Sequence, residues 1–324
     1  MKTLDASAEG SLAASRRGFA SATGSDVLLA LGWWELLDEL HDAEMRAAVF
    51  ALFRAQGAEL GDSCALGALL AHPYGPARFA EGSVAATIAR RSARRGPTQI
   101  LLGDPAVDHL LIDSPGAGAC IVPRSDVGLR PIDVPGRLTI HEVIVERMPV
   151  PTIVEEDARA ARQRSVFLGR VAAAFEILGA AEAALALAVE HAMVRTQFGE
   201  PIATFQAVRH LLAWARTDCA AVESVAHEAQ QLDTIAPPRF DQIVKALAGR
   251  NGRRACERAL QVLGAIGFTA EHRHHHLHAR VLTLDSILGS SSELASGLAA
   301  WLRETRRDPD IPRTLLLRGT REAG

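Results

Sequence analysis

The feature that most constrains the fold is a long stretch without proline, at residues 157–195. It reads DARAARQRSVFLGRVAAAFEILGAAEAALALAVEHAMVR and consists mostly of alanine, leucine and charged residues. Alanine and leucine favour helices strongly, and proline is the main residue that would break one. We therefore predict one long helix here. Two more helical segments follow at about 201–232 and 239–264, separated by TIAPPR, so the second half of the chain is predicted to be a helical bundle.

The first half of the chain has two different patterns. In DAEMRAAVFALFRAQGAEL (42–60), apolar residues such as Met45 and Val49 recur on one helical stripe. From residue 98 onward, short alternating runs such as HLLIDS and HEVIVERM are separated by Gly, Pro and Asp, which is typical of strands. We therefore predict a mainly α protein with a small β-domain. The expected units are a flexible N-terminus (1–24), a helical domain (25–97), a middle β-domain (98–156), the bundle (157–303) and a tail (304–324).

The bulk composition excludes several classes of partner. The net charge of −3 over 324 residues gives no general electrostatic reason to bind nucleic acid. We find no uninterrupted apolar run of roughly 18 residues, the length that a membrane span needs. The four cysteines are scattered without a CxxC spacing, which favours a reduced compartment. We therefore expect a cytoplasmic protein with no membrane span and no nucleic-acid partner.

The run EHRHHHLHAR (271–280) contains five histidines, and its spacings include two i, i+4 pairs. Two histidines on one helical face could begin a zinc site. No cysteine lies nearby to complete a ligand set, and the only nearby carboxylates are Glu271 and Asp285. We therefore predict a helix with partly solvated histidines and no metal.

The stretch RTQFGEPIATFQAVRHLLA (195–213) follows the long helix. It places Arg195 at a helix end, then a Gly-Glu-Pro break, then a new helix that begins near Pro201. Arg195, with Gln197 and Gln206 nearby, could bind a phosphate through charge-assisted hydrogen bonds. Spacing alone favours the alternative, an arginine that caps a solvated turn.

This stretch resembles the signature of the acyl-CoA dehydrogenases, R-x-x-F-G-x-P-I-x-x-F-Q followed by L-A. A second block, LQVLGAIGFTAEHRHHHLHAR (260–280), is similar to the family stretch Q-x-x-G-G-x-G-[FY]-T-x-E. The order of helices, small β-domain and four-helix bundle also fits that family. The resemblance implies an acyl-CoA dehydrogenase-like fold, an FAD cofactor, an acyl-CoA substrate and a separate electron acceptor.

In that family a carboxylate removes the α-proton of the acyl-CoA, and the flavin accepts a hydride. The base is usually a glutamate in a loop I-Y-E-G-T, which aligns here with SILGSSSEL (286–294) and places Gly289 at the glutamate. In a minority of members the base precedes a helical arginine, and the matching pair here is Gly169 and Arg170. We therefore expect no catalytic base, with Arg170 in a supporting role. Glu293 is expected to be a poor substitute.

The flavin-binding residues are only partly retained. The short β region lacks the family segments E-P-x-x-G-S-D and [IV]-[ST]-N, so the chain's own flavin pocket is predicted to be incomplete. Family residues that reach across a dimer interface to the ADP half of the neighbouring FAD are kept, with alanine in place of one glycine. The expected cofactor-binding residues are Arg195, Gln197, Phe198, Gln206, Gln261, Gly264, Ala265 and Ser291.

These features predict a short subunit, without its own base, of a heteromeric acyl-CoA dehydrogenase. The expected partner is a full-length acyl-CoA dehydrogenase subunit in a two-plus-two heterotetramer, and a steroidal acyl group is one candidate substrate. Two alternatives stay open. One is a homo-oligomeric dehydrogenase with an unrecognised base, and the other is a non-enzymatic scaffold that binds no flavin.

Overall fold

The predicted long helix is the central element of the structure. The structure is a computed structural model that describes residues 5–21, 24–75, 83–92, 96–103, 105–146, 150–232 and 239–305. This helix, α6 (Glu155–Val194), has 40 residues and carries three acidic residues in its first turn, where they favour the helix dipole. It is the one described helix whose length and apolarity would suit a membrane span, but 78% of that stretch is buried inside the protein. α6 is therefore read as a core helix.

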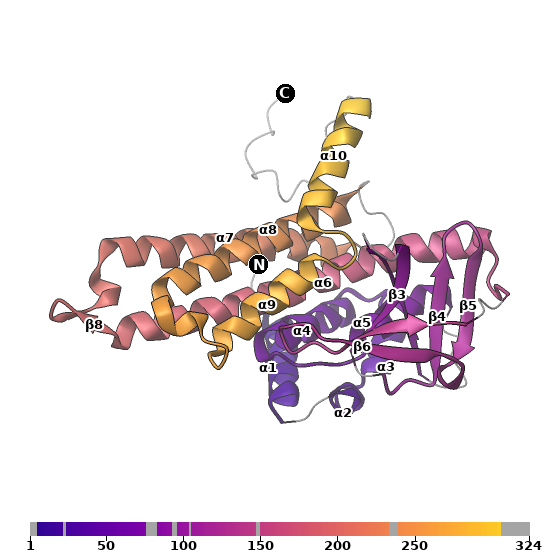
Figure 1. Cartoon of the computed structure of the whole chain (residues 1–324), viewed down its shortest axis with the longest axis horizontal. Coiled ribbons are helices and arrows are strands. Elements are labelled where there is room, and N and C mark those ends of the chain that lie inside the picture. The colour runs from indigo at the N-terminus through magenta and orange to yellow at the C-terminus, as the bar shows by residue number, and fades with distance from the viewer. Residues whose placement is uncertain are drawn as a thin grey trace.

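The C-terminal bundle forms around α6 as predicted. Its other members are α7 (Gln206–Gln231), α8 (Phe240–Leu263), α9 (Arg273–Asp285) and α10 (Ser291–Thr305). In Figure 1, α6, α7 and α8 run alongside one another, whereas α10 projects away from them. Short helical turns, η4 (Ile202–Thr204) and η5 (Gly264–Phe268), precede α7 and follow α8. The predicted tail lies almost wholly outside the described residues, which end at Thr305 in α10.

The N-terminal part is helical from residue 5. It comprises α1 (Asp5–Ser21), α2 (Ser25–Ala30), α3 (Trp33–Asp38), α4 (Ala43–Glu59), α5 (Ala65–Ala71) and the turn η1 (His72–Tyr74). The expectation of a flexible segment at 1–24 was wrong for residues 5–21, because α1 packs on α4. The ring of Phe19 is buried and lies so close to Gly61 that no side chain would fit at that glycine. This tertiary contact orders a helix whose own pattern is weak.

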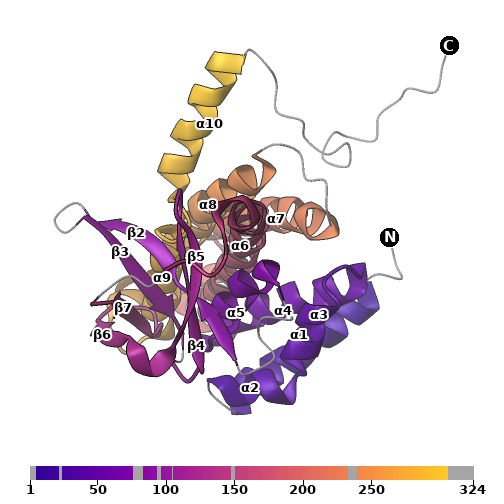
Figure 2. The same cartoon turned by 90° about the vertical axis from the view of Figure 1, so that its right-hand side faces the viewer.

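The β-domain begins earlier than the predicted residue 98. β1 (Val84–Ala86) pairs with β4 (His109–Ser114), which pairs with β5 (Gly118–Pro123). A second sheet has the order β2 (Ile88–Ser92), β3 (Gly96–Leu102), β7 (Ile140–Ile144) and β6 (Gly128–Ile132). The strand β3 was predicted within TQILLGD, whereas β2, which pairs with it, was missed because its buried Ile88 stands almost alone among arginines. In Figure 2 the two sheets lie beside α9 and α6.

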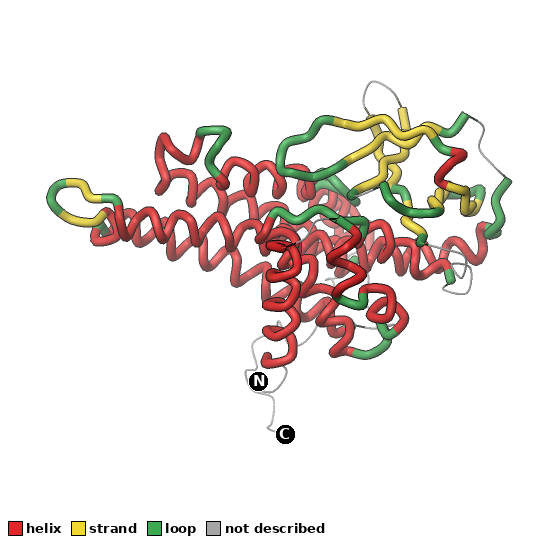
Figure 3. Tube along the Cα trace, turned by 90° about the horizontal axis from the view of Figure 1, so that it is seen from below, coloured by secondary structure: helices red, strands yellow, loops and turns green. Residues whose placement is uncertain are grey.

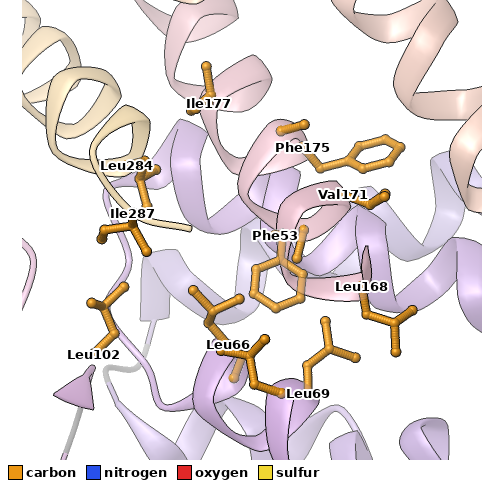
Figure 4. Packing of buried hydrophobic residues seen from close by; sticks show 14 of the residues in the cluster. Phe53, Leu66, Leu69, Leu102, Leu168, Val171, Phe175, Ile177, Leu284 and Ile287 are labelled. Carbon is orange, nitrogen blue, oxygen red and sulfur yellow. The ribbon is translucent and has the colours of Figure 1, made fainter. Parts of the chain in front are cut away.

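The three regions share one core. Figure 4 shows Phe53 of α4, Leu66 and Leu69 of α5, and Leu168 and Val171 of α6 meeting in a single cluster. All five side chains are almost completely buried. Removing this much apolar surface from water is the main force that holds the domains together.

A buried arginine connects α9 to the other regions. Arg280 is fully buried and donates from Nη1 to Oε1 of Glu176 at 3.1 Å, where Glu176 is also buried. It also donates to the backbone carbonyls of Gln56, Gly61 and Gly136. Because these partners come from α6, the α4–α5 region and the loop before β7, Arg280 fixes the position of α9. The four cysteines are all free and buried.

Candidate functional site

A cavity of about 700 Å³ lies between the β-domain and the bundle, where α9 ends. Aliphatic side chains line most of it, and its polar edge includes Arg170, Ser290 and Glu293. Its lining residues are Ile88, Ala89, Ile100, Val134, Ile140, Val166, Arg170, Leu282, Thr283, Ser286, Ile287, Leu288, Gly289, Ser290 and Glu293. Both predicted base positions lie at or beside this cavity.

Neither predicted base position has room for a carboxylate as the chain stands. At Gly169 an added Cβ would lie 2.5 Å from a methyl carbon of Leu70 and 2.8 Å from one of Leu288. Gly289 has φ +99°, a backbone conformation that L-residues rarely adopt, and an added Cβ there would lie 2.8 Å from Leu294. A side chain at either position would require its surroundings to move.

Two cations hold the turn between α9 and α10. Arg170 donates from Nε to the carbonyl of Leu288 at 2.9 Å and from Nη1 to Oδ2 of Asp241 at 2.6 Å. The fully buried Lys245 donates from Nζ to the carbonyls of Asp285 and Gly289, at 3.1 and 3.3 Å. Burial lowers the pKa of Lys245 to about 8, against the opposing effect of the Asp285 carboxylate. The turn is therefore held at its carbonyls from the side of the bundle.

Glu293 caps the N-terminus of α10. Its Oε2 accepts hydrogen bonds from the backbone N–H and the hydroxyl of Ser290, at 3.0 and 2.8 Å. Ser290 Oγ in turn accepts a hydrogen bond from the Glu293 N–H, which makes the pair a capping box. The Ser290 N–H lowers the pKa of Glu293, so this carboxylate holds a proton poorly. It is a weak candidate for proton abstraction.

The motif that follows α6 forms an exposed hairpin at the far end of the bundle. Its strands are β8 (Thr196–Gln197) and β9 (Glu200–Pro201), and Arg195 precedes them. Phe198 at the tip has φ +53° and is 94% exposed, and its ring makes an edge contact with the ring of Phe205. The side chains of Arg195 and Gln206 are exposed, and neither has a hydrogen bond or ion pair to the described residues. Figure 3 shows the hairpin at the opposite end of the molecule from the β-domain.

The second motif lies at the same end of the bundle, where α8 leads into η5 (Figure 1). Gln261 and Ala265 are exposed, and Gly264 has φ +64° with open space where a side chain would stand. Exposed apolar side chains surround these two motifs, namely Met193, Val194, Ile266 and Phe268. We call this end of the bundle, Arg195–Gln206 with Gln261–Phe268, the hairpin end.

Ser291 lies apart from the other predicted cofactor-binding residues. It donates from its N–H and its hydroxyl to the carboxylate of Asp285, both at 3.0 Å. It therefore belongs to the turn beside the cavity and not to the hairpin end. Asp241, Lys245 and Asp285 were not among the predicted site residues, although Lys245 is one of only two lysines in the sequence.

The histidines of residues 272–278 do not converge on one point. His272 caps α9 by accepting from the His274 N–H, and His274 is buried with Nε2 2.9 Å from the carbonyl of Cys256. His275 and His276 contact each other through their rings. Within the described ranges, no group of three or more His, Cys, Asp or Glu side chains is arranged to hold a metal ion.

Comparisons with known proteins agree with this architecture. Residues 159–302 match the family model of the acyl-CoA dehydrogenase C-terminal domain. The chain is 31% identical over 173 residues to acyl-CoA dehydrogenase FadE34 of Mycobacterium tuberculosis, an alignment that covers 52% of this chain and 23% of FadE34. Alignments with this and other curated relatives cover between 23% and 43% of the relatives' own length.

Solved structures resemble the whole chain. The Tcur3481-Tcur3483 steroid ACAD G363A variant superposes with a TM-score of 0.75 at 18% identity, covering 94% of this chain and 99% of that chain. The ChsE4-ChsE5 complex from Mycobacterium tuberculosis superposes with a TM-score of 0.69 at 15% identity, covering 92% and 98%. At these identities the likeness shows the shared fold. The bundle of this protein, residues 159–302, is therefore an acyl-CoA dehydrogenase C-terminal domain, and the chain as a whole has the acyl-CoA dehydrogenase fold.

Proposed function

We propose that this chain is a subunit of an FAD-dependent acyl-CoA dehydrogenase, in which it binds the ADP half of an FAD held mainly by a partner subunit. The partner would be a full-length acyl-CoA dehydrogenase, in a heterotetramer that dehydrogenates an acyl-CoA thioester between Cα and Cβ. When bound, FAD supplies the hydride acceptor of that reaction.

The exposure of the hairpin end is the observation that carries the proposal. Arg195, Gln206 and Gln261 are exposed polar side chains, and Phe198 is exposed almost completely although it is a large apolar residue. Exposed apolar groups that gather on one surface are typical of an interaction site. The guanidinium of Arg195 can bind a pyrophosphate through two parallel hydrogen bonds, while Phe198 packs against the partner. These residues fit an anionic ligand that belongs to a neighbouring subunit.

The cavity supports the proposal that a partner subunit supplies the catalytic base. Its walls are mostly aliphatic, and its described polar edge offers one carboxylate, that of Glu293, which already accepts two hydrogen bonds from Ser290. Gly169 and Gly289 provide no proton acceptor and no space for one. Among the described residues that line the cavity, none is suited to remove an α-proton, and the base would come from the partner.

Assembly with a different chain has support from the structural neighbours. The names of two of them, the Tcur3481-Tcur3483 steroid ACAD and the ChsE4-ChsE5 complex, each combine two proteins. We extend this to the present chain, with a steroidal acyl-CoA as the candidate substrate and a separate electron-transfer protein as the oxidant.

The test is the flavin-to-subunit ratio, measured beside dehydrogenase activity. The chain should be purified alone and also after co-expression with a full-length acyl-CoA dehydrogenase encoded beside it. We expect no flavin and no activity alone, and one flavin per two subunits with activity in the complex. One flavin per chain with activity alone would instead support a homo-oligomeric dehydrogenase. Absence of flavin in both samples would support a non-enzymatic scaffold.

A further inference from the structure

We propose that Leu288, and not Gly289, stands where the catalytic carboxylate of this half-site is missing, and that its side chain seals the position against α6. This deepens the proposed function, on which it rests for the reaction. The sequence alignment places Gly289 at the family's catalytic glutamate, whereas the direction of the side chains in the turn places Leu288 there.

The geometry of Gly289 argues against a catalytic role for that position. Its φ of +99° favours glycine, and a Cβ built there points at the side chain of Leu294 in α10, 2.8 Å away. Its carbonyl accepts a hydrogen bond of 3.3 Å from the buried Lys245 of α8. Gly289 is therefore the residue that allows the turn to form.

Leu288 points in the direction that a base requires. In this family the carboxylate stands either on this loop or just before the helical arginine, which here is Arg170. Because both kinds of base must reach the same α-proton, side chains at the two positions must converge. Of the turn residues, Leu288 is the one that meets Gly169: its methyl carbon lies 2.8 Å from the Cβ that Gly169 would carry, next to a methyl carbon of Leu70 in α5 at 2.5 Å. Leu288 and Gly289 both line the cavity, so the direction of the side chain decides between them.

The backbone of the turn between α9 and α10 is fixed by hydrogen bonds, as a loop that positions a catalytic side chain requires. Arg170 binds the carbonyl of Leu288, and Lys245 binds those of the residues at both ends of the turn, Asp285 and Gly289. The backbone is thus fixed while the side chain that would accept a proton is aliphatic. A carboxylate at position 288 would take the proton from Cα of a bound thioester, and the C–H electron pair would form the enolate. Return of a deuteron from D₂O would complete an exchange without any oxidant.

The packing part of the proposal is tested by a double-mutant cycle on the purified chain. Gly169→Ala should raise the unfolding equilibrium constant because the new methyl group collides with Leu288 and with Leu70. In a Leu288→Ala background that rise should be smaller, because the collision with Leu288 is removed and only the one with Leu70 remains. Gly252→Ala, which meets Ile177 at 2.4 Å instead, is the matched control and should be additive with Leu288→Ala. Additivity between positions 169 and 288 would overturn the assignment.

The catalytic part is tested by deuterium incorporation at Cα of hexanoyl-CoA in D₂O, measured by mass spectrometry. Leu288→Glu should exceed the wild-type rate at least tenfold, because a positioned base typically contributes about 10²–10⁴. Leu288→Gln, which has the same size but no basic carboxylate, should match the wild type. Exchange by Gly289→Glu but not by Leu288→Glu, or by neither variant, would overturn the proposal. Neither experiment needs flavin or a partner subunit, so a failed heteromer would be recognised separately.

Discussion

Arg170 on α6 donates a hydrogen bond of 2.9 Å from Nε to the backbone carbonyl of Leu288, in the turn between α9 and α10. Its other arm makes a 2.6 Å ion pair with Asp241 of α8, and both side chains of that pair are only 15% exposed. One side chain thus joins three elements at the edge of the cavity. This gives Arg170 a structural role beside Gly169, independent of any catalytic base at that position.

Loss of this arginine should destabilise the chain. Arg170→Ala would leave Asp241 largely buried without its partner and the Leu288 carbonyl without a donor, at a cost of about 2–4 kcal/mol of unfolding free energy. Urea denaturation measures this change. Arg303→Ala, on the exposed last turn of α10, is the control and should change stability by less than about 0.5 kcal/mol. A loss of less than about 1 kcal/mol for Arg170→Ala would show that the three-way contact contributes little.

Substitution of Arg195 should weaken flavin binding and leave the fold intact. A bidentate arginine–phosphate contact contributes on the order of 1.5–3 kcal/mol. Arg195→Ala should therefore lower the FAD affinity of the assembled complex about ten- to hundredfold, as measured by flavin fluorescence on dilution. Its unfolding midpoint should match the wild type because the side chain has no partner within the described chain. Arg209→Ala, another exposed cation near the start of α7, should retain flavin. Full flavin retention by Arg195→Ala would contradict the role in pyrophosphate binding.

Substitution of Phe198 should affect assembly. The side chain is 94% exposed in the isolated chain, so Phe198→Ser removes almost no internal packing. If the ring is buried against a partner, its loss should weaken association by about 1.5–3 kcal/mol, measurable as a raised dissociation constant in analytical ultracentrifugation. Leu29→Ser, at a residue on α2 that is 66% exposed and far from the hairpin end in sequence, should leave association unchanged. Equal effects of the two variants would contradict an interface at Phe198.

The buried His274 should make stability depend on acid pH. Burial lowers the pKa of His274, and the hydrogen bond to the Cys256 carbonyl and the neighbouring His272 and His278 act on the same ring. The unfolded chain, with a histidine pKa of about 6.5, then binds a proton more readily than the folded chain. Stability is therefore lost as the pH falls through about 6.5 and below.

His274→Gln should lose less unfolding free energy than the wild type between pH 7.5 and pH 5.0. Urea titrations at the two pH values give the change in unfolding free energy for each protein. The packing cost of the substitution is the same at both pH values and cancels in this change. His210→Gln, on the exposed face of α7, should behave as the wild type. An identical pH dependence for the wild type and His274→Gln would show that another group is responsible.

Much of the architecture could be predicted from local patterns. The absence of proline and the alanine-rich composition predicted the long helix α6, and TIAPPR separated α7 from α8. The motif around Arg195 and Phe198 predicted the family, because its residues form a short contiguous turn whose conformation depends mainly on its own sequence. The strand β2 and the helix α1 were not predicted, because they depend on long-range packing, such as that of Phe19 on Gly61, more than on their own sequence periodicity.

The sequence by itself predicted the resemblance to acyl-CoA dehydrogenases, the order of the three regions and the presence of glycine at both expected base positions. Only the tertiary structure decided which residue of the turn faces Gly169, and that Glu293 is occupied as a helix cap. It also decided that Arg170 of α6 and Lys245 of α8 donate hydrogen bonds to carbonyls of this turn, those of Leu288 and Gly289. The physical reason is that the direction of a side chain in a tight turn depends on the backbone φ and on the partners of the turn. One of these partners, Arg170, is more than a hundred residues away from Leu288 in the sequence. A left-handed residue redirects every side chain after it, and no periodic pattern records that change.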